Sequence, residues 1–104
     1  MSEIVPATPE VKTRDAKPEL KKPRLYKVVL LNDDYTPMNF VVEILQKYFN
    51  MEEQVAVTVM LQVHQKGRGI CGLFTREVAE MKVRDVLEYA RRHQHPLQCT
   101  MEPN

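Results

Sequence analysis

The spacing of hydrophobic and polar residues predicts strands in three parts of the chain. Residues 26–32 and 70–75 are short runs rich in β-branched and apolar residues, which is typical of strands. Residues 97–101 alternate apolar and polar side chains and predict a short closing strand. Because the apolar side chains of residues 26–32 point to both faces, we expect this strand at the centre of a sheet.

Three segments between these strands repeat apolar residues at the spacing of one helix face. They cover residues 40–49, 55–64 and 79–90. A pair of glycines ends the second helix, Thr75 is placed to cap the third, and Pro96 bounds it.

The predicted elements follow in the order β-α-α-β-α-β. Short strands mixed with helices in this way cannot all be joined by parallel crossovers. We therefore expect an α+β fold, with a small three-stranded antiparallel sheet packed against three helices. Residues 1–24 hold four of the seven prolines and none of the seven aromatic residues, which disfavours a packed core. We expect a flexible, disordered N-terminal extension at 1–24 and one core domain at 25–104.

Composition and charge argue against a nucleic-acid-binding protein, a membrane protein and an enzyme. The chain carries 15 Lys and Arg against 14 Asp and Glu, a formal charge of +1, which gives little support to nucleic-acid binding. No apolar run reaches the ~18–20 residues of a membrane span, and no apolar leader precedes residue 24. Two cysteines without paired spacing predict a reducing, cytoplasmic setting. A core this small favours a binding module over an enzyme.

The first candidate for function is the turn after the first strand. Asn32, Asp33 and Asp34 place two carboxylates and an amide carbonyl within three residues. These residue types often cap a helix. Clustered acceptors beside apolar residues also suit an ammonium group with three donors. From spacing alone both interpretations stay open.

His64 is the second candidate, because it falls on the apolar stripe of the second predicted helix. A single histidine at such a position is more often a packed core residue. If it opens into a cleft, its neutral ring can accept one hydrogen bond. Met60 lies four residues earlier on the same face and Met38 lies in the turn, and both can form an adaptable wall.

Two other combinations of reactive residues are weaker. Cys71 with His64 and Asp33 could form a nucleophile site, but a thiol in the middle of a strand is expected to be buried and inert. His93 and His95 with Cys99 resemble metal-ligand spacing only loosely, since a structural zinc site usually needs four ligands. We expect no catalytic residue and no metal.

Several motifs together resemble one known family. Residues 29–38, with the sequence Val-Leu-Leu-Asn-Asp-Asp-Tyr-Thr-Pro-Met, are similar to the signature of ClpS, the adaptor of the AAA+ Clp protease. The similarity runs in collinear order over about residues 24–102. It continues through residues 63–64, 69–72, 77–80, 82 and 95–97.

The resemblance implies a specific function. Members of the family bind proteins whose N-terminal residue is bulky and hydrophobic (Leu, Phe, Tyr or Trp), the N-degron of the bacterial N-end rule. They deliver these proteins to the ClpA unfoldase and the ClpP peptidase. Glu77 and Lys82 match positions that contact the N-terminal domain of the unfoldase. The resemblance implies no enzymatic activity, no cofactor, no nucleic acid and no membrane.

The same resemblance assigns residues to a binding site. The free α-amino group would be held by Asn32, by Asp33 or Asp34, and by His64. The hydrophobic side chain would enter a pocket lined by Leu31, Thr36, Met38, Val41, Met60, Val63 and Leu97.

The alternative is a small RNA- or ribosome-associated α+β module, suggested by the small fold and the basic N-terminal segment. Such a module should cluster Arg and Lys with exposed aromatic residues. Residues 25–104 instead carry 9 basic and 10 acidic side chains, and their aromatic residues mostly fall at core spacing.

Overall fold

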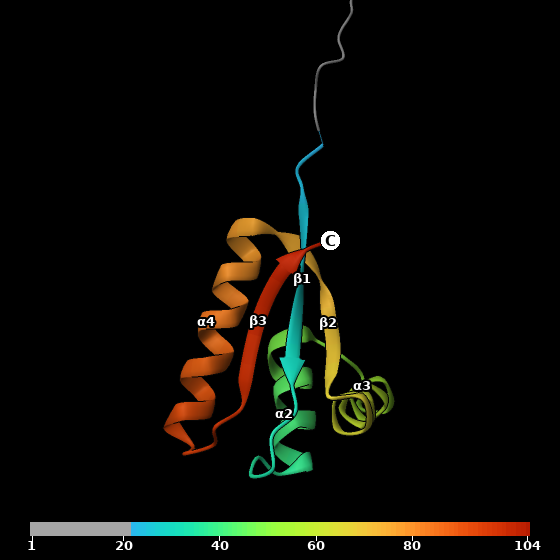
Figure 1. The fold of residues 1–104 in the computed structure, drawn as a ribbon, viewed down its shortest axis with the longest axis vertical. Coiled ribbons are helices and arrows are strands. Elements are labelled where there is room, and N and C mark those ends of the chain that lie inside the picture. The colour runs from blue at the N-terminus through green and yellow to red at the C-terminus, as the bar shows by residue number, and fades with distance from the viewer. Residues whose placement is uncertain (1–21) are drawn as a thin grey trace, which may run out of the picture.

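A computed structural model describes residues 22–104 and confirms the predicted α+β fold (Figure 1). Most of the N-terminal extension expected at 1–24 lies outside the described residues. Elements follow the predicted order β-α-α-β-α-β. They are β1 (Leu25–Leu31), α2 (Met38–Phe49), α3 (Glu53–Lys66), β2 (Arg68–Thr75), α4 (Arg76–Arg92) and β3 (Gln98–Pro103).

The sheet has the strand order β2-β1-β3, and both pairings are antiparallel. The central place of β1 agrees with its sequence, because Val28, Val29 and Leu30 are all fully buried. Figure 1 shows α4 running beside β3 and α3 beside the lower end of β2. Side chains of β1 and of the three helices form one hydrophobic core.

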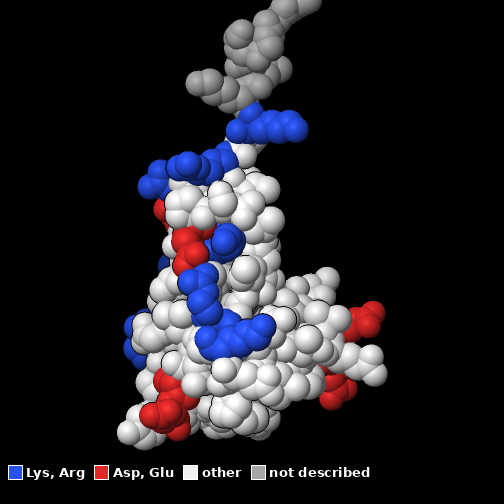
Figure 2. Space-filling model, turned by 45° about the vertical axis from the view of Figure 1, so that its right-hand side comes forward, with Lys and Arg blue, Asp and Glu red and all other residues white. Residues whose placement is uncertain are grey.

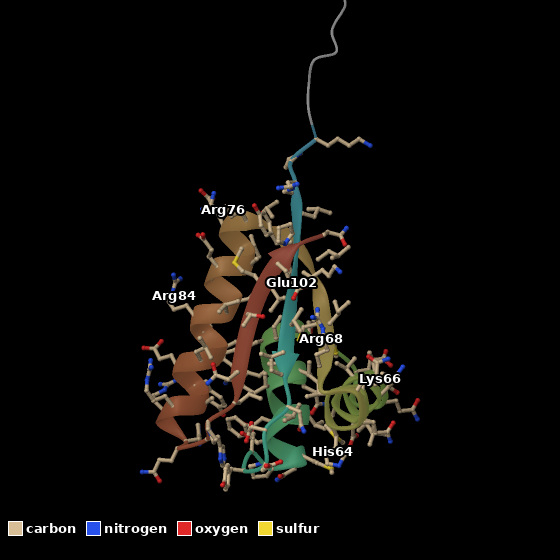
Figure 3. All side chains as sticks on the ribbon, in the orientation of Figure 1. His64, Lys66, Arg68, Arg76, Arg84 and Glu102 are labelled. Carbon is tan, nitrogen blue, oxygen red and sulfur yellow. The ribbon has the colours of Figure 1, made fainter. Side chains whose placement is uncertain are left out.

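On the other face of the sheet, an ion pair crosses the central strand. Arg68 of β2 and Glu102 of β3 approach to 2.9 Å (Figure 3). Their partners on β1 are Leu31 and Lys27, which flank Val29. Val29 points away from Val28 and Leu30 and yet has no exposed surface, which is consistent with cover from this ion pair.

Strand β2 begins at Arg68, two residues before the start that the sequence predicts. The reason lies in the pairing with β1, where Leu31 is the partner of Arg68 and the Asn32 N–H donates a 3.0 Å hydrogen bond to the Gly67 carbonyl. A Cβ on Gly69 would lie 2.7 Å from Val63 Cγ2 and 3.2 Å from the Val59 carbonyl oxygen. This close approach holds α3 against β2.

The ends of the helices depart from the prediction in one respect. Thr75 occupies the N-cap of α4 as expected, but its side chain makes no capping hydrogen bond. At the end of α2, Asn50 adopts a left-handed conformation with φ of 55°, as is common at helix C-termini. Within residues 22–104, no helix combines the length and the apolar composition that crossing a membrane requires.

Candidate functional site

A cavity of about 340 Å³ opens where the turn between β1 and α2 meets α3. Figure 3 places His64 at the lower end of the molecule, where this turn lies. Figure 2 shows acidic side chains at the same end. The cavity is lined by Asn32, Asp33, Asp34, Tyr35, Thr36, Pro37, Met38, Val41, Met60, Val63 and His64.

The turn is held in shape by Asp33. Its Oδ1 accepts hydrogen bonds of 2.8 Å from the backbone N–H groups of Tyr35 and Thr36. Its Oδ2 accepts a 2.7 Å hydrogen bond from the Thr36 hydroxyl. Aspartate is favoured in such turns because its short side chain reaches the backbone two or three residues ahead. This carboxylate therefore acts within the turn.

These contacts also set the charge of Asp33. Partial burial raises its pKa, but the hydrogen bonds from Thr36 and Tyr35, together with the charge of His95, outweigh burial and hold the pKa below its usual value of 3.8. Asp33 is therefore ionised at neutral pH. Its neighbour Asp34 is exposed and forms no side-chain hydrogen bond or ion pair with the rest of residues 22–104, so its carboxylate remains available at the cavity.

The polar side of the cavity combines Asp34 with Asn32 and His64. His64 lies in the last turn of α3 and is exposed. His64 therefore lies at a cavity and not in the packed core, which were the two positions that its spacing in the sequence allowed. A carboxylate, an amide oxygen and an imidazole nitrogen can together accept the three hydrogens of an ammonium group.

The apolar side comes from α2 and α3. Val41, Met60 and Val63 are almost fully buried and present the cavity wall, while Met38 is 44% exposed at its rim. Methionine side chains adapt to the shape of what they contact. A hydrophobic group in this cavity would therefore contact valine and methionine side chains.

The structure brings together most of the residues that the sequence assigned to the side-chain pocket. Thr36 lines the cavity with the four apolar residues above, whereas Leu31 and Leu97 are not among its lining residues. Leu97 is 2% exposed and lies in the wall of a second cavity. Tyr35 and Pro37 line the first cavity but were not predicted. Their position between Asp34 and Met38 in one continuous turn is the signal that could have identified them.

The two residues matched to an unfoldase contact differ in environment. Glu77 is exposed in the first turn of α4. Lys82 is partly buried, and its Nζ donates a 2.6 Å hydrogen bond to the Tyr48 carbonyl. The same ammonium lies 5.7 Å from the centre of the Phe49 ring and 5.8 Å from that of Phe74. Lys82 thus joins α2, β2 and α4.

The reactive combinations considered in the sequence do not form sites. Cys71 and Cys99 are both buried and unpaired. Burial raises the pKa of both thiols, to about 12 for Cys99, so neither is a thiolate nucleophile at neutral pH. Among the described residues, no group of three or more His, Cys, Asp or Glu side chains is placed to hold a metal ion.

Comparison with known proteins gives one consistent family. The model of the ATP-dependent Clp protease adaptor protein ClpS matches residues 21–100. The chain is 60% identical to the ATP-dependent Clp protease adapter protein ClpS of Rhodospirillum centenum, over 84% of this chain and 81% of that protein. It is 65% identical to the same adapter of Zymomonas mobilis, over 82% of this chain and 79% of that protein.

A solved structure has the same fold. Agrobacterium tumefaciens ClpS2 bound to L-phenylalaninamide superposes with a TM-score of 0.78 at 38% identity, covering 80% of this chain and all of that chain.

Proposed function

Since the chain belongs to the ClpS family of ATP-dependent Clp protease adaptor proteins, we propose that its cavity binds the free N-terminus of proteins whose first residue is bulky and hydrophobic. The chain is an adaptor and not an enzyme. Its partners are a Clp protease and the substrates of that protease. The ligand of the Agrobacterium relative, L-phenylalaninamide, is a minimal example of the proposed ligand, with a free α-amino group and an aromatic side chain.

One observation carries this proposal: the lining of a single cavity combines hydrogen-bond acceptors with apolar side chains. Asn32, Asp34 and His64 supply the acceptors. A positively charged α-amino group gains most from the Asp34 carboxylate, because hydrogen bonds to ionised groups are about twice as strong as neutral ones. Asp33 supports this geometry by shaping the turn through Thr36.

The apolar wall adds affinity for the first side chain. Burial of apolar surface contributes roughly 25 cal/mol per Å², so a Leu, Phe, Tyr or Trp side chain gains about 2 kcal/mol. Met38 and Val41 lie beside each other in the first turn of α2. These two side chains would exclude β-branched residues by shape.

The amine site explains why internal segments would not bind. Acetylation of the α-amino group removes its charge and two of its donors, which leaves the acceptors of the cavity unpaired. Sites built to hydrogen-bond a polar group discriminate steeply against ligands that lack it. Proteins with blocked N-termini would therefore be rejected.

Delivery requires a contact with the protease complex. We assign this contact to the N-terminal domain of a ClpA-type unfoldase, working with a ClpP peptidase, through Glu77 and Lys82 on α4. The exposed Glu77 carboxylate is available for such a contact. Lys82 would act largely by holding the surface around α4, since its ammonium already binds Tyr48.

The cytoplasm is the proposed compartment. Both cysteines of the chain are unpaired and buried, and unpaired thiols are typical of proteins in reducing compartments. The alternative of an RNA- or ribosome-associated module has no support from the comparisons, which all give the adaptor family.

Fluorescence anisotropy with one series of labelled peptides tests the proposal. The peptides carry N-terminal Leu, Phe, Ile, Ala or acetyl-Phe and are otherwise identical. Tight binding of the Leu and Phe peptides alone is expected. Equal binding of Phe and acetyl-Phe peptides would overturn the amine site, and equal binding of Phe and Ala peptides would overturn the hydrophobic pocket.

A further inference from the structure

Two methionines line the cavity between the β1–α2 turn and α3, and they differ in exposure. Met60 is 9% exposed, whereas Met38 is 44% exposed at the rim. Met38 is the first residue of α2, and Val41 lies three residues later on the same helix face. Both side chains line the cavity. Met38 is thus part of the apolar wall and is also open to solvent.

Solvent access matters because the thioether of methionine is a common target of oxidation. A peroxide transfers one oxygen atom to the methionine sulfur. A lone pair of the sulfur forms the new S–O bond, the O–O bond breaks, and its electron pair stays with the leaving hydroxide. This hydroxide takes the proton of the transferred oxygen and departs as water, so the sulfur is oxidised and the peroxide is reduced. A thioether carries no acidic proton, so the reaction needs no ionised side chain, in contrast to thiol oxidation.

Most other sulfur-containing side chains of residues 22–104 are shielded from solvent. Cys71 and Cys99 are buried, and burial raises the pKa of both thiols, so the reactive thiolate is scarce at neutral pH. Met51 and Met101 are partly buried against the hydrophobic core. The rim of the cavity therefore holds one of the few sulfur atoms that a small oxidant in solvent can reach.

Oxidation changes what the cavity wall presents to a ligand. Methionine sulfoxide is polar, whereas the thioether packs as an apolar, adaptable group. A Leu or Phe side chain in the cavity has no donor for the sulfoxide oxygen. Contact between them leaves a polar group without a partner, which is unfavourable. Because the valines of the wall and the acceptors of the turn are not oxidised, the effect falls on the hydrophobic part of binding.

We propose that Met38 is an oxidation site that controls the cavity: a peroxide converts it to methionine sulfoxide, which weakens binding of a hydrophobic N-terminal residue. The proposal rests on the proposed function, which places that residue's side chain against Met38. The change is reversible, because methionine sulfoxide reductases restore the thioether, with one enzyme for each epimer at sulfur. In the reduction two thiols become a disulfide, and the oxygen leaves as water.

The test measures fluorescence anisotropy of a peptide with N-terminal Phe before and after treatment of the full chain with hydrogen peroxide. The treated wild type should bind about tenfold more weakly, as expected for one polar group without a partner. Met38→Leu keeps an apolar side chain at the rim but has no sulfur there. Since this variant also alters the cavity wall, its treated form is compared with its own untreated form, and the two should bind alike.

Met81→Leu is the matched control. Met81 is 39% exposed and lies in the first half of α4. Figure 3 places Arg76, the first residue of α4, at the opposite end of the molecule from His64. Met81 is therefore as open to the oxidant but away from the cavity, and Met81→Leu should lose affinity after peroxide as the wild type does.

Two further measurements use the wild type. Both methionine sulfoxide reductases, supplied with dithiothreitol, should return the affinity of the oxidised chain to its starting value. Mass spectrometry of proteolytic fragments should show that bound Phe peptide slows oxidation of Met38 but not of Met81. The acetyl-Phe peptide, which lacks the α-ammonium, should give no such protection.

The outcomes separate the two proposals. Unchanged affinity in a wild type that carries sulfoxide at Met38 would overturn the oxidation site, and so would oxidation of Met81 without oxidation of Met38. An equal loss in wild type and Met38→Leu would assign the effect to another residue and overturn it as well. In these three cases the proposed function still stands. If the untreated chain does not bind the Phe peptide, the proposed function fails and the oxidation site fails with it.

Discussion

Asp33 holds Thr36 through both of its carboxylate oxygens, one on the backbone N–H at 2.8 Å and one on the hydroxyl at 2.7 Å. Its neighbour Asp34 has no such bond within residues 22–104. Both aspartates line the cavity, but the division between them is clear: the Asp33 carboxylate is hydrogen-bonded within the turn, and we propose that Asp34 is the one that meets the ligand.

The two aspartates should respond differently to the same substitution. Asp33→Asn should lower the free energy of unfolding by about 1 kcal/mol, because a neutral amide has only one acceptor oxygen for three donors. Asp34→Asn should leave stability within about 0.5 kcal/mol but weaken binding of a Phe peptide about tenfold. Urea unfolding and peptide anisotropy measure the two effects. Equal loss of stability in both variants would contradict the division.

Acid should remove the contribution of Asp33 to stability. Its folded-state pKa lies below the usual 3.8, so the folded state binds fewer protons than the unfolded state in this range, and this stability is present above pH 3.8. It is lost as the pH falls through the folded-state pKa. The difference in stability between the wild type and Asp33→Asn should therefore be full at pH 6 and shrink below pH 4. A difference that stays constant from pH 6 to pH 3 would show that the ionised carboxylate is not responsible.

The other acceptors of the cavity should each contribute to affinity. Asn32→Ala and His64→Ala should weaken binding of a peptide with N-terminal Phe by about 10-fold or more, because hydrogen bonds to charged groups are worth about 1.5–3 kcal/mol. Gln65→Ala, an exposed neighbour on α3, is the matched control. Changes below twofold in both site variants would rule out their assignment to the ammonium.

The packing of β2 against α3 at Gly69 should affect peptide affinity, because it positions Val63 in the cavity wall. Gly69→Ala should lower stability by about 1–3 kcal/mol and weaken peptide binding, because its Cβ would displace Val63, which lines the cavity. Gly67→Ala meets no atom within 4 Å, although its φ of 87° is strained for alanine. This control should lose stability but keep its affinity for the peptide. If the Gly69→Ala variant folds and binds the peptide with normal affinity, the packing at Gly69 does not affect the cavity.

Lys82 should contribute to stability as well as to any partner contact. Lys82→Met keeps the length of the side chain but leaves the Tyr48 carbonyl without its donor, so unfolding should become easier by about 1–2 kcal/mol. Lys66→Met, on an exposed residue, should change stability by less than about 0.5 kcal/mol. If urea unfolding gives the same free energy of unfolding for both variants, the hydrogen bond from Lys82 to Tyr48 does not contribute to stability, and the Lys82 ammonium is free to act at the surface.

The sequence alone determined the elements and the fold class, because strand and helix patterns follow from the local spacing of apolar residues. The full burial of Val28 to Leu30 in a central strand followed from a run that is apolar on both faces. The cluster Asn32 to Asp34 was also visible, since its members are adjacent in the chain. Its capping and ligand-binding interpretations could not be separated there, because both use the same side-chain oxygens.

Tertiary structure decided what depends on residues distant in the chain. Only the packing of α3 against the turn placed His64 at a cavity instead of in the core, and only the register of β1 with β3 put Leu97 in the wall of a second cavity. Lys82 is 34 residues from Tyr48, so no local pattern could reveal that its ammonium is engaged. Spacing reports which face a side chain occupies, whereas its partners depend on which elements meet that face in space.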